Sequence, residues 1–169
     1  CIMDTFEILS QLCSAAGVSG AEGSAAEAAA KLLEKYGEVT LDNALGSVIC
    51  KVGSWEDGKP VMLLDAHIDE IGMIVTYITE DGFLKISGCG GLDTRLLLAQ
   101  QVTVYGREKL TGIVTSTPPH LEKDSSDAPE LDSVFIDIGF TSRENAAKYV
   151  SLGDRVLIEN KAERLAGSR

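Results

Sequence analysis

The second half of the chain carries short apolar segments separated by turn residues, and this spacing constrains the fold more than any other feature of the sequence. Few helical stretches interrupt these segments, apart from residues 142–149. Short strands at regular intervals, bounded by turn signals, are typical of a small barrel or a sandwich. We predict such a domain, with strands at Ile71–Ile78, Phe83–Ser87, Gln101–Tyr105, Leu110–Ser116, Val134–Ile138 and Arg155–Glu159.

The first part of the chain has a mixed pattern. Asp4 stands where it can cap a helix that runs to about Ala15. Ser19 and Glu22 have the spacing of a capping box ahead of an alanine-rich helix over residues 25–36. Three strands are then predicted, at Val39–Leu41, Ser47–Val52 and Val61–Ala66. The last one is apolar at nearly every position, as in a strand covered on both faces, so this part is interpreted as the first edge of an α/β domain.

An imidazole and a carboxylate follow the apolar run directly, at His67 and Asp69. Positions two apart in a strand share a face, and α/β folds usually bind their ligands at the carboxyl ends of strands. We predict a metal-binding histidine that is oriented by a nearby carboxylate. Spacing alone also allows a histidine that is merely hydrogen-bonded at a strand end. For the flanking Asp65 and Glu70, ordinary roles at the surface or sheet edge are the simpler interpretation.

Charge and hydropathy exclude two classes of function. The net charge of −11 repels phosphate backbones, which argues against nucleic-acid binding. No stretch approaches the roughly 18 apolar residues of a membrane span, and the N-terminal residues do not form a signal peptide. The four cysteines lack C-x-x-C spacing, so we expect reduced, mostly buried thiols and a cytoplasmic protein.

The His67 and Asp69 pair belongs to an ordered series of motifs that covers nearly the whole chain. The series comprises Gly17–Gly20, Asp42–Gly46, Ala66–Gly72, Asp81–Leu84, Gly90–Arg95, Gln100–Val102, Gly112–Val114, Pro118–His120, Val134–Gly139, Thr141–Glu144 and Gly153–Asp154. Each motif alone is unspecific, but in this order the set resembles the dinuclear-metal aminopeptidases of the glutamyl and deblocking aminopeptidase family. Large members of that family assemble into hollow tetrahedral particles.

The resemblance implies an α/β fold with an inserted domain. Residues 1–73 would be the N-terminal part of a dinuclear-metal aminopeptidase catalytic domain, and residues 74–160 a PDZ-like β-barrel domain that serves assembly. Residues 161–169 would return toward the rest of the catalytic domain. Further ligands and the glutamate general base follow this segment in the family, so the resemblance implies a truncated chain. Peptide substrates and a homo-oligomer are the implied partners.

The resemblance also assigns roles at the site. His67 would be a ligand of one of two divalent ions, zinc or cobalt, and Asp69 would be the catalytic carboxylate that orients its ring. In such a site the two ions polarise the scissile carbonyl and activate a water, while a carboxylate takes the proton. Zinc commonly needs three or four protein ligands. Because this chain offers one, we expect an incomplete site and no activity from the chain alone.

Three other motifs invite a functional interpretation. Asp93 and Arg95 mimic a metal-bridging motif, but they precede the predicted strand Gln101–Tyr105 and match a glycine-rich loop of the inserted domain, so we assign them no metal. His120 follows two prolines and is interpreted as a loop histidine. The segment Gly88–Gly91 lacks the spacing of a phosphate-binding loop and is interpreted as a turn.

Two functional classes stay open at this point. One is a metalloaminopeptidase that removes N-terminal residues from peptides, and the other is a non-catalytic fragment that self-associates. Some relatives carry an endoglucanase label. Aromatic residues make up 5% of the chain, too few for a sugar-binding platform, and spacing singles out no carboxylate pair for glycoside hydrolysis.

Overall fold

A computed structural model of the chain describes residues 4–42, 44–116, 129–158 and 161–167. The chain divides into two compact units, Cys1–Glu70 together with Asn160–Arg169, and Ile71–Glu159. The division falls three residues before the boundary expected at residue 73.

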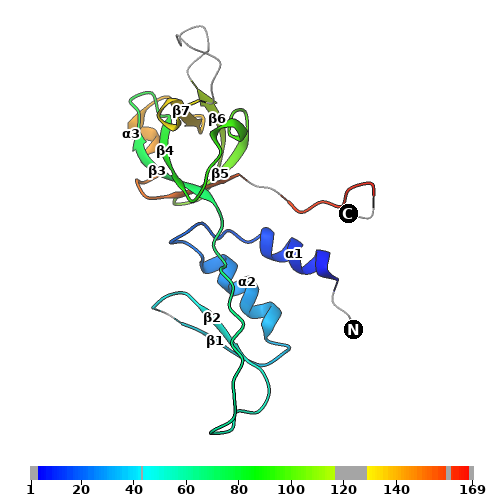
Figure 1. Cartoon of the computed structure of the whole chain (residues 1–169). Coiled ribbons are helices and arrows are strands. Elements are labelled where there is room, and N and C mark those ends of the chain that lie inside the picture. Colours follow the sequence, from blue (N-terminus) through cyan, green and yellow to red (C-terminus); the bar gives the residue numbers. More distant parts are fainter. Residues whose placement is uncertain (1–3, 43, 117–128, 159–160, 168–169) are drawn as a thin grey trace. The chain divides into compact units, whose positions relative to one another are not determined.

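The second unit is a closed antiparallel barrel (Figure 1) with the strand order β3-β4-β7-β6-β5-β8. Its strands are β3 (Gly72–Ile78), β4 (Leu84–Cys89), β5 (Gln101–Tyr105), β6 (Lys109–Ser116), β7 (Val134–Asp137) and β8 (Arg155–Ile158). Pairing of β8 with both β3 and β5 completes the closure, which leaves these strands without exposed edges. All six strands of this domain are thus confirmed, and the choice between barrel and sandwich is settled in favour of the barrel.

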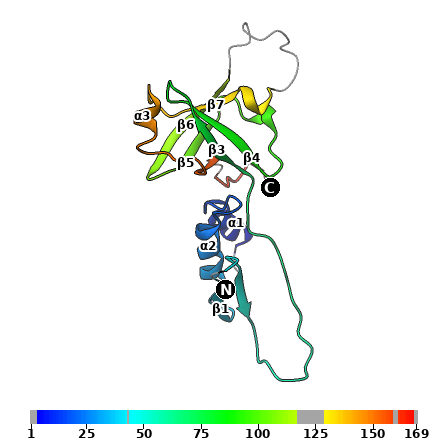
Figure 2. The ribbon, with the colours of Figure 1, turned by 90° about the vertical axis from the view of Figure 1, so that its left-hand side faces the viewer.

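The barrel encloses a core of aliphatic side chains. Met73, Leu84, Val104 and Ile136 are fully buried in it. Between the strands lie the short helices η1 (Thr94–Leu96), η3 (Leu131–Ser133) and α3 (Arg143–Ala146). Helix α3 begins after its N-cap Ser142, inside the stretch 142–149 that was expected to be helical, and contributes buried Ala146 to the core. Viewed from the side, the strands cross one another at a tilt (Figure 2), as closure of a small barrel requires.

The first unit contains two helices and a two-stranded antiparallel sheet. Helix α1 (Thr5–Cys13) begins at the predicted cap, because the Asp4 side chain accepts a hydrogen bond from the Phe6 amide. Helix α2 (Gly23–Leu33) buries three small alanine side chains. The sheet pairs β1 (Glu38–Leu41) with β2 (Val48–Lys51), which confirms two more predicted strands.

Helix α2 lacks the predicted capping box. Its N-cap is Glu22, which makes no side-chain capping bond. The carboxylate of Glu22 instead accepts from the Gly20 amide, and the Ser19 hydroxyl donates to Asp69. The prediction was wrong because a capping box is a local pattern, whereas the bond that Ser19 makes joins residues 50 positions apart.

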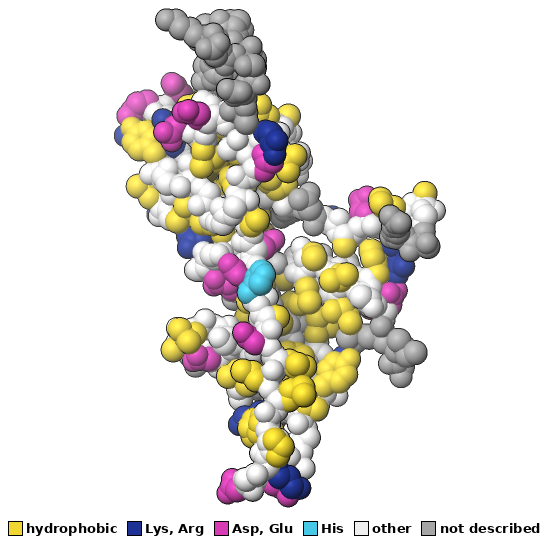
Figure 3. Space-filling model, viewed as in Figure 1, with side chains coloured by type: hydrophobic (Ala, Val, Ile, Leu, Met, Phe, Trp, Pro, Cys, Tyr) yellow, Lys and Arg dark blue, Asp and Glu magenta, His cyan; other side chains and the backbone are white. Residues whose placement is uncertain are grey.

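The predicted strand Val61–Ala66 is also wrong. This segment belongs to an extended stretch between β2 and β3 (Figure 2) without assigned strand structure. Val61, Met62, Leu63 and Leu64 are 62–87% exposed. A strand needs a neighbour for its backbone hydrogen bonds, and the described residues supply none to this segment. The apolar run therefore remains exposed. Figure 3 shows that many hydrophobic side chains lie on the drawn face of the molecule.

The three thiols in the described part of the chain are free but less buried than predicted, and Cys1 lies outside the described residues. Cys13 is exposed, while Cys50 and Cys89 are half-buried, because Cys13 ends the exposed helix α1 and the other two lie on strands with one partly open face. Within the described part of the chain, every helix is too short or too polar to cross a bilayer.

Candidate active site

His67 and Asp69 lie in the first unit, on the extended segment that leads toward β3. The ring nitrogen Nδ1 of His67 is 3.1 Å from Asp69 Oδ1 and 3.2 Å from the backbone oxygen of Asp69. The two side chains thus meet as the i, i+2 spacing predicts, although the backbone between them is not part of a sheet. The His67 side chain is 85% exposed and that of Asp69 is 42% exposed.

This geometry favours a neutral His67 ring with its proton on Nδ1. Both groups that face Nδ1 are oxygen acceptors. A neutral imidazole has one N–H donor and one lone pair, so Nδ1 must donate and Nε2 must hold the lone pair. The exposed Nε2 of His67 is therefore the atom that can bind a metal ion.

Ser19 completes a hydrogen-bonded series of three side chains. Its hydroxyl donates to Asp69 Oδ2 over 2.5 Å, on the opposite side of the carboxylate from His67. The Ser19 hydroxyl, and after it the His67 ring, lowers the pKa of Asp69 below its ordinary value. No spacing signal in the sequence indicates this contact of Ser19, because it joins residues 50 positions apart.

The loop that carries Ser19 is held against residue 70. The Gly17 amide donates to Glu70 Oε1, and the Glu70 amide donates to the Gly17 oxygen, each over 2.8 Å. Val18, 2% exposed, forms a parallel bridge with Glu70. A Cβ at position 17 would lie 2.8 Å from the Cβ of Ala25, so only glycine permits this packing against α2. Glu70 thus has the ordinary structural role expected for it.

A tight turn then points Ser19 at Asp69. The Ala21 amide donates to the Val18 oxygen over 2.7 Å, which makes Ser19 and Gly20 the central residues of a β-turn. Gly20 has φ of 81°, which is the backbone conformation that a type II turn requires at its third position. The motif Gly17–Gly20 therefore specifies the loop geometry that supports Asp69.

Of the other candidate residues, Asp93 belongs to the second unit. Asp93 is bound by Arg95, whose Nε is 2.9 Å from Oδ1 and whose Nη2 is 2.6 Å from Oδ2. This contact lowers the pKa of Asp93 and raises that of Arg95. Asp65 is exposed on the extended segment, and His120 lies outside the described residues.

The predicted turn at Gly88–Gly91 is confirmed. Strand β4 ends at Cys89, and Gly90 follows with φ of 88°. A side chain at position 90 would also lie 3.1 Å from Ile71.

The ligands of a complete metal site are not assembled among the described residues, where no three His, Cys, Asp or Glu side chains form a group that could hold an ion. His67 offers one imidazole, and its orienting carboxylate uses both oxygens on other partners. Zinc commonly takes three or four protein ligands. This segment therefore supplies one ligand of a metal site, and no catalytic step can be derived from it alone.

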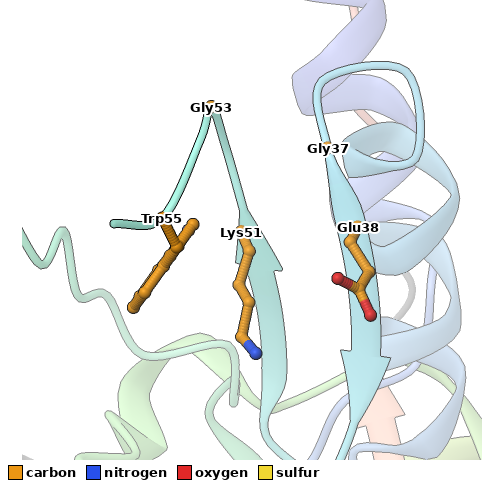
Figure 4. A pocket seen from close by; sticks show the side chains of 5 residues that line it. All are labelled: Gly37, Glu38, Lys51, Gly53 and Trp55. Atoms are coloured by element: carbon orange, nitrogen blue, oxygen red, sulfur yellow. The ribbon is translucent and has the colours of Figure 1, made fainter. Parts of the chain in front are cut away.

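An open pocket lies elsewhere in the first unit, beside the paired strands β1 and β2. It is lined by Gly37, Glu38, Lys51, Gly53 and Trp55 (Figure 4). The Lys51 ammonium lies 5.5 Å from the centroid of the Trp55 ring. The lining includes none of the residues that the sequence singled out, so the pocket adds nothing to the candidate site.

Comparison with known proteins identifies the family. Residues 46–169 match the M42 glutamyl aminopeptidase family. The chain belongs to this family. The resemblance to the glutamyl aminopeptidase family is thus confirmed.

Several relatives match nearly all of this M42 chain. It is 29% identical to the lysyl aminopeptidase of Pyrococcus furiosus, covering 85% of this chain and 42% of that protein. A TET aminopeptidase from a marine sediment archaeon of the Thaumarchaeota is 33% identical, with a TM-score of 0.81, and covers 92% of this chain and 44% of that one. An aminopeptidase from Desulfurococcus kamchatkensis is 30% identical, with a TM-score of 0.86, and covers 96% and 45%. The chain thus spans less than half the length of these relatives.

Proposed function

We propose that this chain is part of a metal-dependent aminopeptidase that releases N-terminal residues from peptides. Membership of the M42 family and the names of the relatives support the reaction class. One observation in the structure supports the assignment of the site. The carboxylate oxygen Oδ1 and the backbone oxygen of Asp69 both face Nδ1 of His67, which leaves Nε2 of the exposed ring as the atom that can bind a metal ion.

In this proposal His67 binds one of two divalent ions, zinc or cobalt, and Asp69 is the catalytic carboxylate that orients the ring. The ions would supply Lewis acidity and an activated water when bound. The described residues contribute the oriented imidazole and the Ser19-bound carboxylate. The remaining ligands and the general base would come from residues outside the described part of the chain.

The second unit takes the assembly role in this proposal. We assign the barrel to a PDZ-like domain over about residues 74–160, residues 1–73 to the catalytic domain, and residues 161–169 to a return segment. One structurally similar protein, 31% identical with a TM-score of 0.83, forms a dodecamer in the asymmetric unit of its crystal. A TET1 peptidase from Pyrococcus horikoshii, 31% identical with a TM-score of 0.80, assembles into a tetrahedron or an octahedral shell. These two relatives support a homo-oligomer. The free thiols of Cys13, Cys50 and Cys89 support a location in the cytoplasm, where thiols stay reduced.

A decisive experiment replaces the imidazole in the longest protein that contains this segment. We expect His67→Ala to lower aminopeptidase turnover by at least about 100-fold, because an empty coordination position weakens the metal site. His120→Ala is the matched control and should keep its activity. Wild-type turnover by His67→Ala, at equal metal occupancy, would refute the ligand assignment.

Residues 1–169 alone should show no metal-dependent turnover of aminoacyl substrates, because the described residues assemble no group of three ligands. The measurement is release of a chromophore with added zinc or cobalt after rigorous purification. Turnover that follows the metal concentration would show that this segment holds a complete site.

The second candidate function is a non-catalytic assembly fragment. Four consecutive apolar side chains, Val61 to Leu64, are 62–87% exposed, and such a run favours association. Light scattering should then show oligomers above the 18.0 kDa monomer. Leu63→Lys should reduce association, whereas Leu45→Lys should not, because Leu63 and Leu45 are 85% and 84% exposed but only Leu63 lies within an apolar run. A wild-type monomer at high micromolar concentration would contradict this candidate.

A further inference from the structure

We propose that Ser19 is a positioning residue for the candidate metal ligand: its hydroxyl holds the Asp69 carboxylate so that the His67 ring keeps its proton on Nδ1 and presents Nε2 outward. The inference deepens the proposed function, since it concerns the ring assigned there as a ligand. It assigns a role to a serine that sequence patterns interpret as a helix cap.

The Asp69 carboxylate accepts a hydrogen bond on each of its two oxygens. An ionised carboxylate only accepts, so the bond of 2.5 Å between Ser19 Oγ and Asp69 Oδ2 has the hydroxyl as donor. The other oxygen, Oδ1, faces His67 Nδ1 at 3.1 Å. With one oxygen held by Ser19, rotation of the carboxylate about its terminal bond would break a bond on each side. The Ser19 hydroxyl therefore fixes the plane in which Oδ1 meets the ring.

Exposure makes this restraint necessary. The Asp69 side chain is 42% exposed and that of His67 is 85% exposed, so packing restrains neither strongly. Water competes for both carboxylate oxygens at such a surface. The backbone oxygen of Asp69 is a second acceptor for Nδ1, at 3.2 Å, but it carries less negative charge than the carboxylate. Loss of the Ser19 bond should thus loosen the ring and reduce the population with the proton on Nδ1.

The position of Ser19 is itself restrained, as a positioning role requires. Gly17 and Glu70 exchange two hydrogen bonds of 2.8 Å immediately before the turn that carries Ser19. Val18 is buried at the base of that turn. The hydroxyl is therefore presented from a fixed backbone rather than from a mobile loop tip.

The experiment measures the ring tautomer directly, without metal or substrate. The chain has two histidines, so His120→Gln is placed in every sample to leave one imidazole. Nitrogen-15 NMR at about pH 9, where imidazoles are neutral, distinguishes a protonated Nδ1 from a protonated Nε2. We expect the Nδ1–H form to dominate in the parent, to fall at least about twofold relative to the Nε2–H form in Ser19→Ala, and to return in Ser19→Thr.

Ser14→Ala is the matched control, because it removes a hydroxyl bond of 2.6 Å in the same unit, to the Ser10 oxygen. It should leave the His67 tautomer unchanged. A parent ring that is mainly Nε2–H would overturn the proposal without any variant, and so would a Ser19→Ala ring identical to the parent. If Ser19→Ala does not fold, Ser19→Cys tests the same point with a weaker donor of similar size.

Zinc titration of the same samples separates this inference from the proposed function. Zinc should shift the Nε2 resonance of the parent. Ser19→Ala should need about tenfold more zinc for the same shift, because loss of the group that orients a metal ligand lowers metal affinity by about tenfold or more. One imidazole alone binds zinc weakly, so the titration extends to zinc concentrations at which a lone, exposed imidazole binds. A parent ring whose Nε2 resonance does not shift even there, while its tautomer depends on Ser19, would contradict the ligand assignment alone. A zinc response that is equal in parent and Ser19→Ala would contradict the positioning role alone.

Discussion

Three consecutive leucines in the barrel unit offer a stringent test of the fold. Leu96, Leu97 and Leu98 are 66%, 0% and 41% exposed. Leucine to alanine at position 97 removes three buried carbons, which at about 0.8 kcal/mol each corresponds to about 2.4 kcal/mol of transfer free energy. The cavity left in the closed barrel adds to this, so we expect Leu97→Ala to lower the free energy of unfolding by about 3–4 kcal/mol. Leu96→Ala should cost less than about 1 kcal/mol, because two thirds of that side chain already faces solvent.

The assay must report on the barrel itself. The single tryptophan, Trp55, lies in the first unit, so urea unfolding is followed by amide NMR signals of the barrel strands. In a unit of about 90 residues, 3 kcal/mol corresponds to a fall in Tm of at least about 12 °C. Equal losses of stability for Leu96→Ala and Leu97→Ala would refute the assigned register of this turn and the core that depends on it.

Three further predictions concern charge and backbone geometry. Asp93→Asn should destabilise the barrel at neutral pH, and the difference from wild type should vanish in urea titrations as pH falls below 3.8, because Arg95 lowers the pKa of the folded Asp93 below that ordinary value and the contribution is lost on protonation. Ala99→Gly should raise the free energy of unfolding by about 0.5–1 kcal/mol, since Ala99 has φ of 62°; a loss of stability would contradict this. Gly37→Ala should weaken the first unit, measured by Trp55 fluorescence during urea unfolding, because its Cβ would lie 2.0 Å from the Lys51 oxygen.

The barrel was predictable because its signals are local. Each strand is an apolar run bounded by turn residues, and β5 (Gln101–Tyr105) has the bounds that the sequence indicates. The leucine run at residues 96–98 shows the limit of such patterns. Hydropathy ranks the three equally, and only the three-dimensional packing of the barrel places one of them, Leu97, in its core.

The apolar run Val61–Ala66 shows why composition alone misled. Apolar residues indicate a buried strand only when partners exist to cover them. The described residues supply none to this segment, so it keeps its exposed apolar side chains. The prediction of a covered strand at this position is therefore wrong.

The contact between His67 and Asp69 was predictable from spacing, but the support for it was not. Two residues apart, the side chains meet without a sheet. Ser19 reaches Asp69 only because Gly17 and Glu70 bring distant segments together. Pattern analysis assigned Ser19 to a helix cap, since capping is the commonest local use of a serine at that spacing.

The arrangement also restricts how a metal ion can approach. Nδ1 of His67 already faces two oxygen acceptors, at 3.1 and 3.2 Å, so a metal that bound this nitrogen would have to displace both and remove its proton. Nε2 carries no such cost, and the 85% exposure of the side chain leaves it open to residues from elsewhere. One fixed imidazole cannot hold zinc firmly by itself. Because the ring is oriented before a metal binds, less side-chain entropy is lost when further ligands complete the site. A carboxylate held by Ser19 would provide this advantage.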